Sequence, residues 1–280
     1  MMPVRMLLTP GPLVAVGVHD GLSALLAAEA GAKALYVGGF AAAASLGLPD
    51  IGLLMQTEMA AHLARIRAVC RDLPIIVDAD TGYGAAANVA RTVELFEAAG
   101  ANAIQVEDQA WPKRSGHLRG KRVISAAEMI GKLKAALDAR RNPELMIIAR
   151  TDAMAVEGRN AAIDRAGAYA EAGVDALFID APRSRQDLEA IGTLARFGRP
   201  LVFNATAGWH APTLSTDEAV RCGFILILQP VDLLLAAFEA MRHALRGSAD
   251  PPARASPADA FHELGALLHL PDATRTPTDP

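Results

Sequence analysis

Two carboxylates stand one residue apart directly after a short apolar run. Residues 75–77 are Ile-Ile-Val, Asp78 and Asp80 follow, and residues 81–84 form a Gly-rich turn. The apolar run predicts a buried strand, and in parallel α/β proteins ligands bind at the carboxyl ends of strands. Carboxylate oxygens suit a hard divalent cation, although Asp in a turn also serves to cap the chain. The pair therefore indicates either a metal site or a capped turn.

Polar residues follow the other apolar runs in the same way. If the strands close into a barrel, their carboxyl ends meet at one rim and bring these side chains together. Acids after strands can also cap the next helix, and this alternative stays open for Asp152 and Asp180. So many carboxylates beside one Arg predict a functional site. The residues are Tyr36, Asp78, Asp80, Glu107, Asp108, Arg150, Asp152, Asp180, Asn204 and Thr206.

Two connections are long. The first, residues 111–122, is longer than the roughly six residues usual for a connection between a strand and a helix. It carries five cations, His117 and two Gly. We interpret this segment as a lid that brings positive charge onto an anionic substrate and expels water; the alternative is a solvated basic loop. The other connection holds Gly38, Gly39 and residues 45–50, whose backbone amides could bind a carboxylate or phosphate.

Strand-like and helix-like runs alternate along the chain. Eight such units favour a (β/α)₈ TIM-type barrel over a doubly wound sheet, for which the Gly-rich phosphate turn is also missing. The expected strands are 13–17, 34–37, 75–77, 103–106, 145–149, 176–179, 201–203 and 224–228, and the expected helices are 22–30, 57–70, 88–99, 126–141, 161–172, 185–197, 217–221 and 231–246.

The last part of the chain differs from the repeating units. We expect the barrel domain to span 1–246, a Gly/Pro/Ser-rich linker 247–257, an extra C-terminal helix 258–270 and a disordered tail 271–280. The extra helix carries Phe261, Leu264, Leu267 and Leu268 on one face. Because that face has to be buried, we favour exchange of this helix between subunits of a homo-oligomer over packing on its own barrel.

The composition narrows the function classes. The hydrophobic fraction of 52% supports a large core, and a net charge of −4 offers no footprint for nucleic acid or a membrane surface. The two cysteines have neither disulfide nor metal spacing, and no signal peptide or membrane span is recognised. We therefore expect a soluble, cytoplasmic protein.

Together these segments resemble the isocitrate lyase/phosphoenolpyruvate mutase superfamily, over nearly the whole chain. The similarity is carried by the segments 45–50, 78–84, 106–109, 113–117 and 149–153, in this order. The branch that looks most similar contains 2-methylisocitrate lyase and carboxyvinyl-carboxyphosphonate phosphorylmutase. The resemblance implies a Mg²⁺-dependent barrel, in which Mn²⁺ could replace Mg²⁺, assembled as a tetramer of two swapped dimers.

The resemblance also implies roles for individual residues. Asp80 would bind Mg²⁺ most directly, Asp78 and Glu107 largely through water, and Asp50 would support the site. Tyr36 and the loop at Gly38 and Gly39 would contact the 2-oxo-acid part of a small carboxylate substrate. Arg150 would hold its carboxylate and developing enolate, and His117 and Asn204 its other carboxylates. The remaining assignments are Lys113 and Ser115 to catalysis and Ser45, Gly47, Asp180 and Thr206 to substrate binding.

The sequence departs from the lyase pattern in the half of the site that acts on the leaving fragment. Active lyases carry Cys in the lid as the general acid/base, whereas this chain has Ser115. A serine hydroxyl is far less acidic than a thiol, whose pKa is about 8.5. Three further positions differ from the family. A Glu that follows the seventh strand in the family is replaced by Ala207, the Glu at the sixth strand by Asp180, and a Ser or Thr in the loop after the second strand by Gly38.

The sequence therefore leaves three functions open. The first is a Mg²⁺-dependent carbon–carbon lyase for a small 2-hydroxy or 2-oxo di- or tricarboxylate, or an oxaloacetate decarboxylase, in which water can protonate the enolate without a lid thiol. The second is a phosphonomutase of the carboxyphosphonoenolpyruvate type. The third is a metabolite-binding protein with little catalysis, against which the many carboxylates of the site argue.

Overall fold

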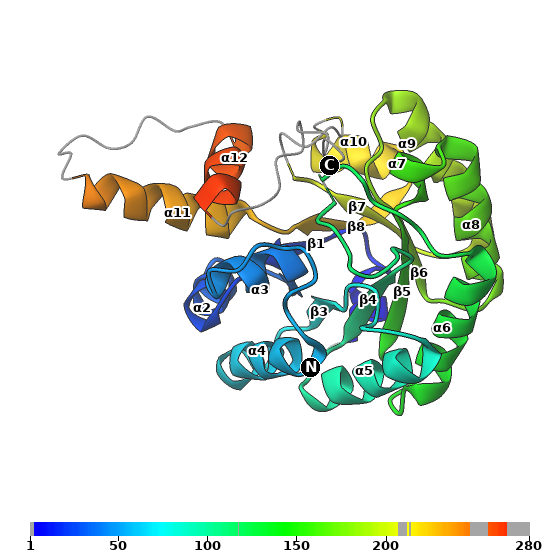
Figure 1. The fold of residues 1–280 in the computed structure, drawn as a ribbon, viewed down its shortest axis with the longest axis horizontal. Helices are drawn as coiled ribbons and strands as arrows, with labels where there is room; N and C mark the ends of the chain where they lie inside the picture. Colours follow the sequence, from blue (N-terminus) through cyan, green and yellow to red (C-terminus); the bar gives the residue numbers. More distant parts are fainter. Residues whose placement is uncertain (1–2, 117, 207–211, 213, 247–256, 268–280) are drawn as a thin grey trace, which may run out of the picture.

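Eight parallel strands close into a barrel in sequence order, and β8 pairs with β1 (Figure 1). The predicted TIM-type barrel is therefore confirmed. The computed structural model describes residues 3–116, 118–206, 212, 214–246 and 257–267. The strands are β1 Leu13–Gly17, β2 Ala34–Val37, β3 Ile75–Asp78, β4 Ala103–Glu107, β5 Met146–Thr151, β6 Ala176–Ile179, β7 Leu201–Asn204 and β8 Phe224–Gln229.

Most of the helices connect successive strands and surround the barrel, whereas the first precedes β1 and the last two follow β8. They are α1 Val4–Leu7, α2 Gly21–Glu29, α3 Gly39–Ser45, α4 Gln56–Val69, α5 Ala86–Ala98, α6 Ala126–Ala139, α7 Ala153–Val156, α8 Arg159–Glu171, α9 Arg185–Gly192, the 3₁₀ helix η1 Thr193–Phe197, α10 Thr216–Arg221, α11 Asp232–Leu245 and α12 Pro257–Leu267. The short helices α1, α3 and α7 were not predicted. In particular, α3 occupies most of the predicted loop after β2, and Gly38 is its N-cap residue.

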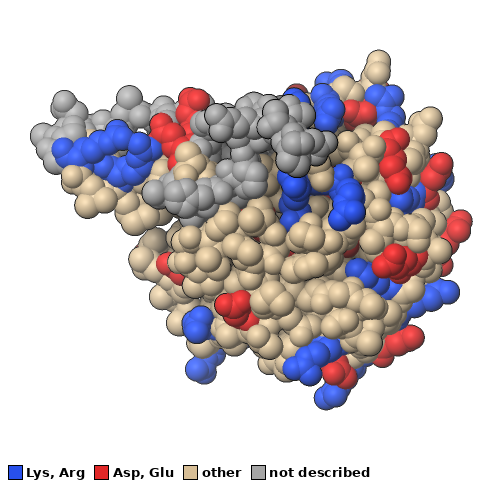
Figure 2. All heavy atoms as spheres, viewed as in Figure 1, with Lys and Arg blue, Asp and Glu red and all other residues tan. Residues whose placement is uncertain are grey.

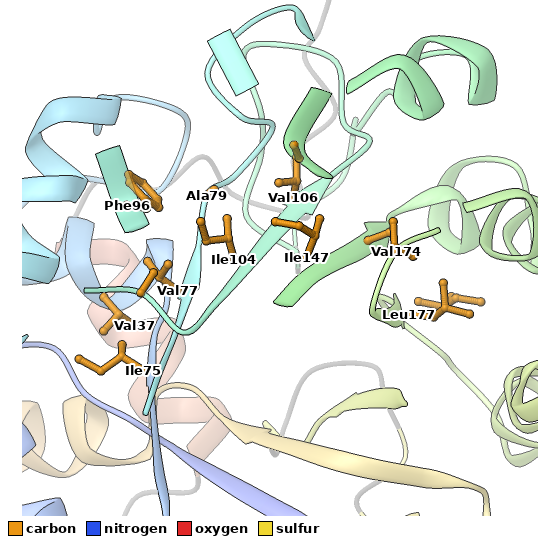
Figure 3. Packing of buried hydrophobic residues seen from close by; sticks show 14 of the residues in the cluster. Val37, Ile75, Val77, Ala79, Phe96, Ile104, Val106, Ile147, Val174 and Leu177 are labelled. Carbon is orange, nitrogen blue, oxygen red and sulfur yellow. The ribbon is translucent and has the colours of Figure 1, made fainter. Parts of the chain in front are cut away.

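The strands are buried on both faces, which explains their continuous apolar sequences. Along β3, Ile75 and Val77 join the layer between strands and helices, whereas Ile76 belongs to the cluster inside the barrel. Figure 3 shows the outer layer, in which Ile104 and Val106 of β4 share one apolar cluster with Phe96 of α5. Successive residues thus fill two separate apolar layers, and the polar residues that end each strand are left at the rim.

Local signals set the ends of several helices. The Asp20 carboxylate accepts a hydrogen bond from the Ser23 amide, and the Ser23 hydroxyl accepts one from the Asp20 amide, forming a reciprocal cap on α2. Ser125 caps α6 by accepting a hydrogen bond from the Glu128 amide. Gly100 follows α5 with a φ of 100°, a backbone conformation that favours glycine.

The helix α11 does not cover the barrel as the other helices do. Figure 1 shows α11 and α12 projecting outward from the barrel as an arm, also visible in Figure 2. Leu235 and Phe238 of α11 share an apolar cluster with Phe40 of α3 and Leu264 of α12, and Arg242 forms an ion pair with Glu263 of α12. The predicted linker and tail lie almost wholly outside the described residues. None of the described helices is long and apolar enough to span a bilayer.

An ion-pair cluster fastens the end of the barrel opposite the rim. Asp175, just before β6, lies 2.5 Å from Arg5 Nη2 and 2.6 Å from Arg140 Nη1, and accepts a hydrogen bond of 2.8 Å from the Ile147 amide. This Asp is 5% exposed. It therefore joins the N-terminal segment, the α6–β5 connection and β5 at the end of the barrel that serves stability.

We predict that Asp175→Ala lowers the free energy of unfolding by about 3 kcal/mol, because two arginines and one amide lose their buried acceptor. Chemical denaturation followed by circular dichroism measures this loss. The control is Asp164→Ala, which removes an exposed carboxylate from α8 and should change stability by less than about 0.5 kcal/mol. Equal effects of the two substitutions would contradict the assigned role.

Candidate active site

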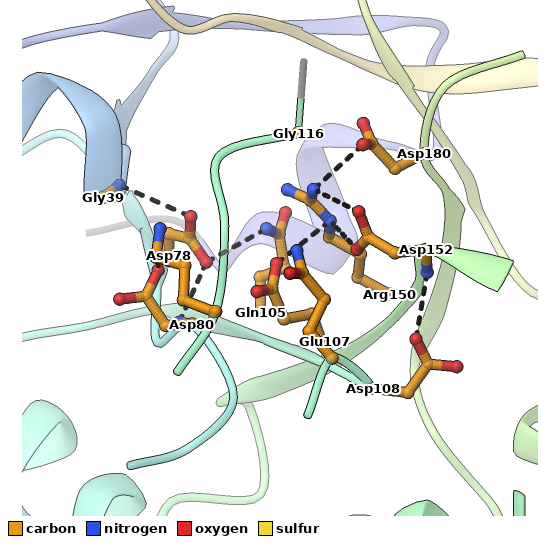
Figure 4. A network of polar contacts seen from close by, with 12 residues as sticks. Gly39, Asp78, Asp80, Gln105, Glu107, Asp108, Gly116, Arg150, Asp152 and Asp180 are labelled. Carbon is orange, nitrogen blue, oxygen red and sulfur yellow. Dashed lines mark hydrogen bonds and ion pairs between the residues drawn. The ribbon is translucent and has the colours of Figure 1, made fainter. Parts of the chain in front are cut away.

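The carboxyl ends of β3, β4 and β5 place an extensive set of buried charges at the rim (Figure 4). Asp78 and Glu107 end β3 and β4, and Arg150 lies near the end of β5. The register pairs Glu107 directly with Arg150. Because the strands are short and in parallel register, side chains separated by more than 70 positions in the sequence converge on one site.

One half of the site gathers carboxylates around the lid lysine. Lys113 Nζ is hydrogen bonded to Asp50 and lies 2.7 Å from Asp80 Oδ1. Asp78 accepts hydrogen bonds from the Asp80 amide at 3.1 Å and from Gln105 Nε2 at 3.2 Å. Asp80 has a φ of 47°, an uncommon backbone conformation outside glycine, which turns its side chain into the cluster.

The other half is organised around Arg150. Its guanidinium makes two hydrogen bonds to Asp152, of 2.9 and 3.1 Å, and lies 3.0 Å from Asp180 Oδ2 and 3.3 Å from Glu107 Oε2. Lys121 of the lid joins the same acids, with Nζ 2.7 Å from Asp152 Oδ1 and 3.3 Å from Asp180 Oδ2. Asp152 and Asp180 therefore pair with cations, and Asp152 makes no capping hydrogen bond to α7.

Asp108 faces away from the carboxylate cluster and supports it from behind. It accepts hydrogen bonds from Thr151 Oγ1 at 2.7 Å, the Asp152 amide at 2.9 Å and Tyr169 Oη at 2.8 Å. Arg165 Nη1 approaches the same carboxylate at 3.4 Å. Asp108 thereby fixes the backbone of the residue that holds Arg150, and we describe it as a positioning residue.

Burial shifts the pKa values of the clustered groups. Burial raises the pKa of Asp80 to about 7; the Lys113 ammonium opposes this rise, and the Asp78 and Asp50 carboxylates add to it. Burial also raises the pKa of Glu107 well above its usual value, against the opposing effect of Arg150. Such carboxylates favour any partner that brings positive charge.

The lid closes over this pocket. Ser115 is 3% exposed, and its amide donates a hydrogen bond to the Asp50 carbonyl. The remaining cavity is only about 40 Å³, enough for one or two water molecules and far below the roughly 300–1,000 Å³ of small-molecule sites. The lid must therefore move to admit a carboxylate substrate.

Most of the predicted residues meet at this pocket. Tyr36, Gly38, Gly39, Asp50, Asp78, Glu107, Lys113, Ser115, Arg150, Asp180 and Asn204 line it, and Asp80 contacts Lys113 beside it. Thr206 donates a hydrogen bond of 2.6 Å to Asn204 Oδ1 and so acts through Asn204. Ser45 and Gly47 lie outside the lining at the end of α3, where the Ser45 hydroxyl bonds to the Ala42 carbonyl. His117 is outside the described residues.

The sequence interpretation missed Lys121 as a partner of the acids and Gln105 as a support for Asp78. Gln105 is fully buried in β4, and a polar residue between Ile104 and Val106 in an apolar strand was the available signal. For Lys121, nothing in the sequence distinguishes the ammonium that pairs with rim acids from the other lid cations.

The residues present fit a divalent cation in the carboxylate half. Among the described residues, no three Asp, Glu, His or Cys side chains are already arranged as a metal cluster. However, Glu107 Oε1 is buried without a hydrogen-bond partner, and Asp80 Oδ1 has only its ion pair with Lys113. Asp50 and Asp80 already hold one cation, the Lys113 ammonium. Carboxylate oxygens are hard donors and are suitable ligands for Mg²⁺.

Comparisons with known proteins agree with this geometry. Residues 4–248 match the family model for phosphoenolpyruvate phosphomutase. The chain therefore belongs to this family, within the isocitrate lyase/phosphoenolpyruvate mutase superfamily.

Three relatives differ in their reactions. The chain is 40% identical to 2,3-dimethylmalate lyase of Eubacterium barkeri, over 85% of this chain and 81% of that protein. It is 43% identical to 2-methylisocitrate lyase of Aeropyrum pernix, over 84% of this chain and 74% of that protein. It is 41% identical to the chloroplastic carboxyvinyl-carboxyphosphonate phosphorylmutase of Arabidopsis thaliana, over 86% and 72%. These relatives support an enzyme and leave the substrate open.

Solved structures show the same fold. Oxaloacetate acetylhydrolase in complex with 3,3-difluorooxalacetate superimposes with a TM-score of 0.83 and 33% identity, over 94% of this chain and 92% of that one. Phosphonopyruvate hydrolase in complex with oxalate and Mg²⁺ superimposes with a TM-score of 0.75 and 29% identity, over 91% of this chain and 90% of that one. Members of the superfamily thus combine this barrel with small dicarboxylate ligands and, in one of these structures, Mg²⁺.

We predict that Asp108→Asn lowers the free energy of unfolding by about 2–3 kcal/mol, since an amide cannot accept from every donor that now faces the carboxylate. Urea denaturation measures the loss. Tyr169→Phe, which removes one donor and leaves the acid, should cost only about 1 kcal/mol. A larger loss for Tyr169→Phe than for Asp108→Asn would mean that the acid is not the centre of this network.

Proposed function

We propose that this protein is a Mg²⁺-dependent lyase that cleaves a carbon–carbon bond of a small 2-hydroxy or 2-oxo di- or tricarboxylate. The observation that carries the proposal is the division of the pocket into a half lined by the Asp50 and Asp78 carboxylates and a half that holds the Arg150 guanidinium. A substrate with a carboxylate and an adjacent oxygen matches both halves. Its relatives that cleave dimethylmalate and methylisocitrate support the same reaction class.

The residues of the chain divide the work. Asp80, Asp78, Glu107 and Asp50 would hold the metal, which when bound supplies Lewis-acid stabilisation of the substrate oxygen. Arg150, fixed by Asp152, would neutralise the negative charge that develops as the bond breaks. Tyr36 and the amides near Gly39 would orient the 2-oxo-acid portion, and closure of the lid would exclude water.

The lid residue decides how the departing carbanion is protonated. Ser115 lies at the pocket but is a poor general acid, because its hydroxyl is much less acidic than a thiol. Oxaloacetate decarboxylation is therefore favoured within this proposal: the carbon–carbon bond to the carboxylate breaks, CO₂ leaves, and water protonates the resulting enolate. The 41% identity to a carboxyphosphonate-type mutase makes phosphonomutase the second candidate. Binding without turnover is the third.

The first test is an NMR endpoint assay with Mg²⁺, with and without EDTA, on 2-methylisocitrate, dimethylmalate, oxaloacetate and phosphonopyruvate. We expect EDTA-sensitive formation of pyruvate from a 2-hydroxy or 2-oxo acid. Asp80→Asn should lower the rate at least about 100-fold through loss of metal. Turnover of none of the first three compounds, or turnover that EDTA leaves unchanged, would exclude the lyase proposal, and turnover of phosphonopyruvate alone would favour the phosphonomutase.

A second test exchanges the lid hydroxyl. We expect Ser115→Cys to raise cleavage of 2-methylisocitrate or dimethylmalate about 10- to 100-fold, because a thiol can serve as general acid. Ser115→Ala is the matched control and should leave oxaloacetate decarboxylation within about threefold. If Ser115→Cys gives no gain while metal-dependent decarboxylation persists, the pocket is specialised for decarboxylation.

We further propose that the chain forms a homo-oligomer in which the α11–α12 arm packs against the barrel of a second copy. Met241 and Leu245 on α11 are 58% and 88% exposed, and Leu22 and Leu26 on α2 are 65% and 53% exposed. Exposed apolar surfaces of this kind are often covered by subunit interfaces. This proposal extends the predicted helix exchange to include α11.

Light scattering after gel filtration tests the assembly. We expect wild type to elute as a tetramer or dimer and the double variant Leu22→Glu/Leu26→Glu to shift toward monomer. Met6→Glu, which changes an equally exposed residue (57%) on α1, should leave the mass unchanged. A monomeric wild type would rule out the arm exchange.

A further inference from the structure

A second cavity lies on the other side of the lid. Its volume is about 480 Å³, within the range of small-molecule sites and far larger than the closed pocket at Arg150. Gly116 is the lining residue that the two have in common among the described residues. The remaining walls come from lid residues 118–121, from the end of α7 and from the β6–α9 connection.

The walls of this cavity carry uncompensated positive charge. Arg119 of the lid and Arg183 of the β6–α9 connection both line it and are exposed. None of the described residues forms an ion pair with either guanidinium, and no described carboxylate lines the cavity. Lys121 differs, because Asp152 and Asp180 neutralise it. Two arginines from different segments of the cavity wall are suited to an anion with two charged ends.

The rest of the lining is apolar. Leu118 is buried, Val156 of α7 is 40% exposed, and Ala155 and Ala181 complete this surface. A bare inorganic anion would leave these side chains without contacts. A short aliphatic chain between two carboxylates would cover them while its ends reach the arginines.

The cavity is connected to the pocket at Arg150 through a single layer of ion pairs. Lys121 Nζ donates to the Gly116 carbonyl at 2.7 Å and lies 3.3 Å from Asp180, which in turn lies 3.0 Å from Arg150. Ala181, next to Asp180, has a φ of 59°, a strained conformation for a non-glycine residue at the wall of the cavity. Because the lid and the β6–α9 connection both line the cavity, a ligand that contacts both would stabilise the closed lid.

We propose that this cavity is a second, non-catalytic site for a short aliphatic dicarboxylate, held between Arg119 and Arg183, and that its occupancy restrains the lid. Binding here does not require the proposed lyase reaction. Glutarate is the probe, because it has two carboxylates and an aliphatic chain but no 2-oxo or 2-hydroxy group for the pocket at Arg150.

The experiment is calorimetric titration of the full-length protein with glutarate in EDTA. We expect Arg119→Gln and Arg183→Gln each to weaken binding at least about tenfold, since each removes one charge-assisted contact. Arg185→Gln is the matched control: it lies two positions from Arg183, outside the cavity lining, where it pairs with Glu189, and should stay within about twofold. No binding, or equal binding by all variants, would overturn the site.

Hydrogen exchange measured by mass spectrometry supplies the second readout. Glutarate should slow exchange of the amides in residues 114–122 of wild type and of Arg185→Gln, and not in Arg119→Gln or Arg183→Gln. Inorganic phosphate that binds as tightly through the same two arginines would overturn the dicarboxylate assignment. A protein inactive on the whole substrate panel that still binds glutarate through these arginines would disprove the lyase proposal and leave this site intact.

Discussion

The structure depends on pairing many buried charges at one end of the barrel. An unpaired carboxylate or guanidinium in this environment would carry a large desolvation cost. The chain meets this constraint by placing Arg150 among Glu107, Asp152 and Asp180. Lys121 adds a second positive charge to these acids. The balance is local, so removing any one group leaves its partners uncompensated, and the rim behaves as one electrostatic unit.

The lid belongs to this unit. Lys113 and Lys121 each reach from the lid into a different group of acids, at Asp50 and Asp80 and at Asp152 and Asp180. Lid position and charge balance are therefore linked: the lid cannot open without exposing carboxylates, and a bound cation or substrate changes what the lid lysines contact. This coupling explains why one segment can both admit a ligand and shield it from water.

Support for the site comes from residues that never face the pocket. Asp108 holds the Asp152 backbone from the helix side, and Gln105 holds Asp78 from within the barrel. Both use donors and acceptors that are already buried, so they fix the rim carboxylates without occupying the pocket. Asp108 follows β4 like a rim acid, yet the alternation of side chains along the strand turns it outward, directly after Glu107 turns inward.

The sequence by itself determined the barrel and the identity of most rim residues. Apolar runs at regular spacing specify buried strands, and the residue after each run has to lie at the carboxyl end whatever the details of packing. Tertiary structure alone decided which charges pair, that Ser45 lies away from the pocket, and that α11 leaves the barrel. Such outcomes depend on distances between segments far apart in the chain, such as Asp50 and Lys113, which are fixed only when the barrel closes and the lid packs onto it.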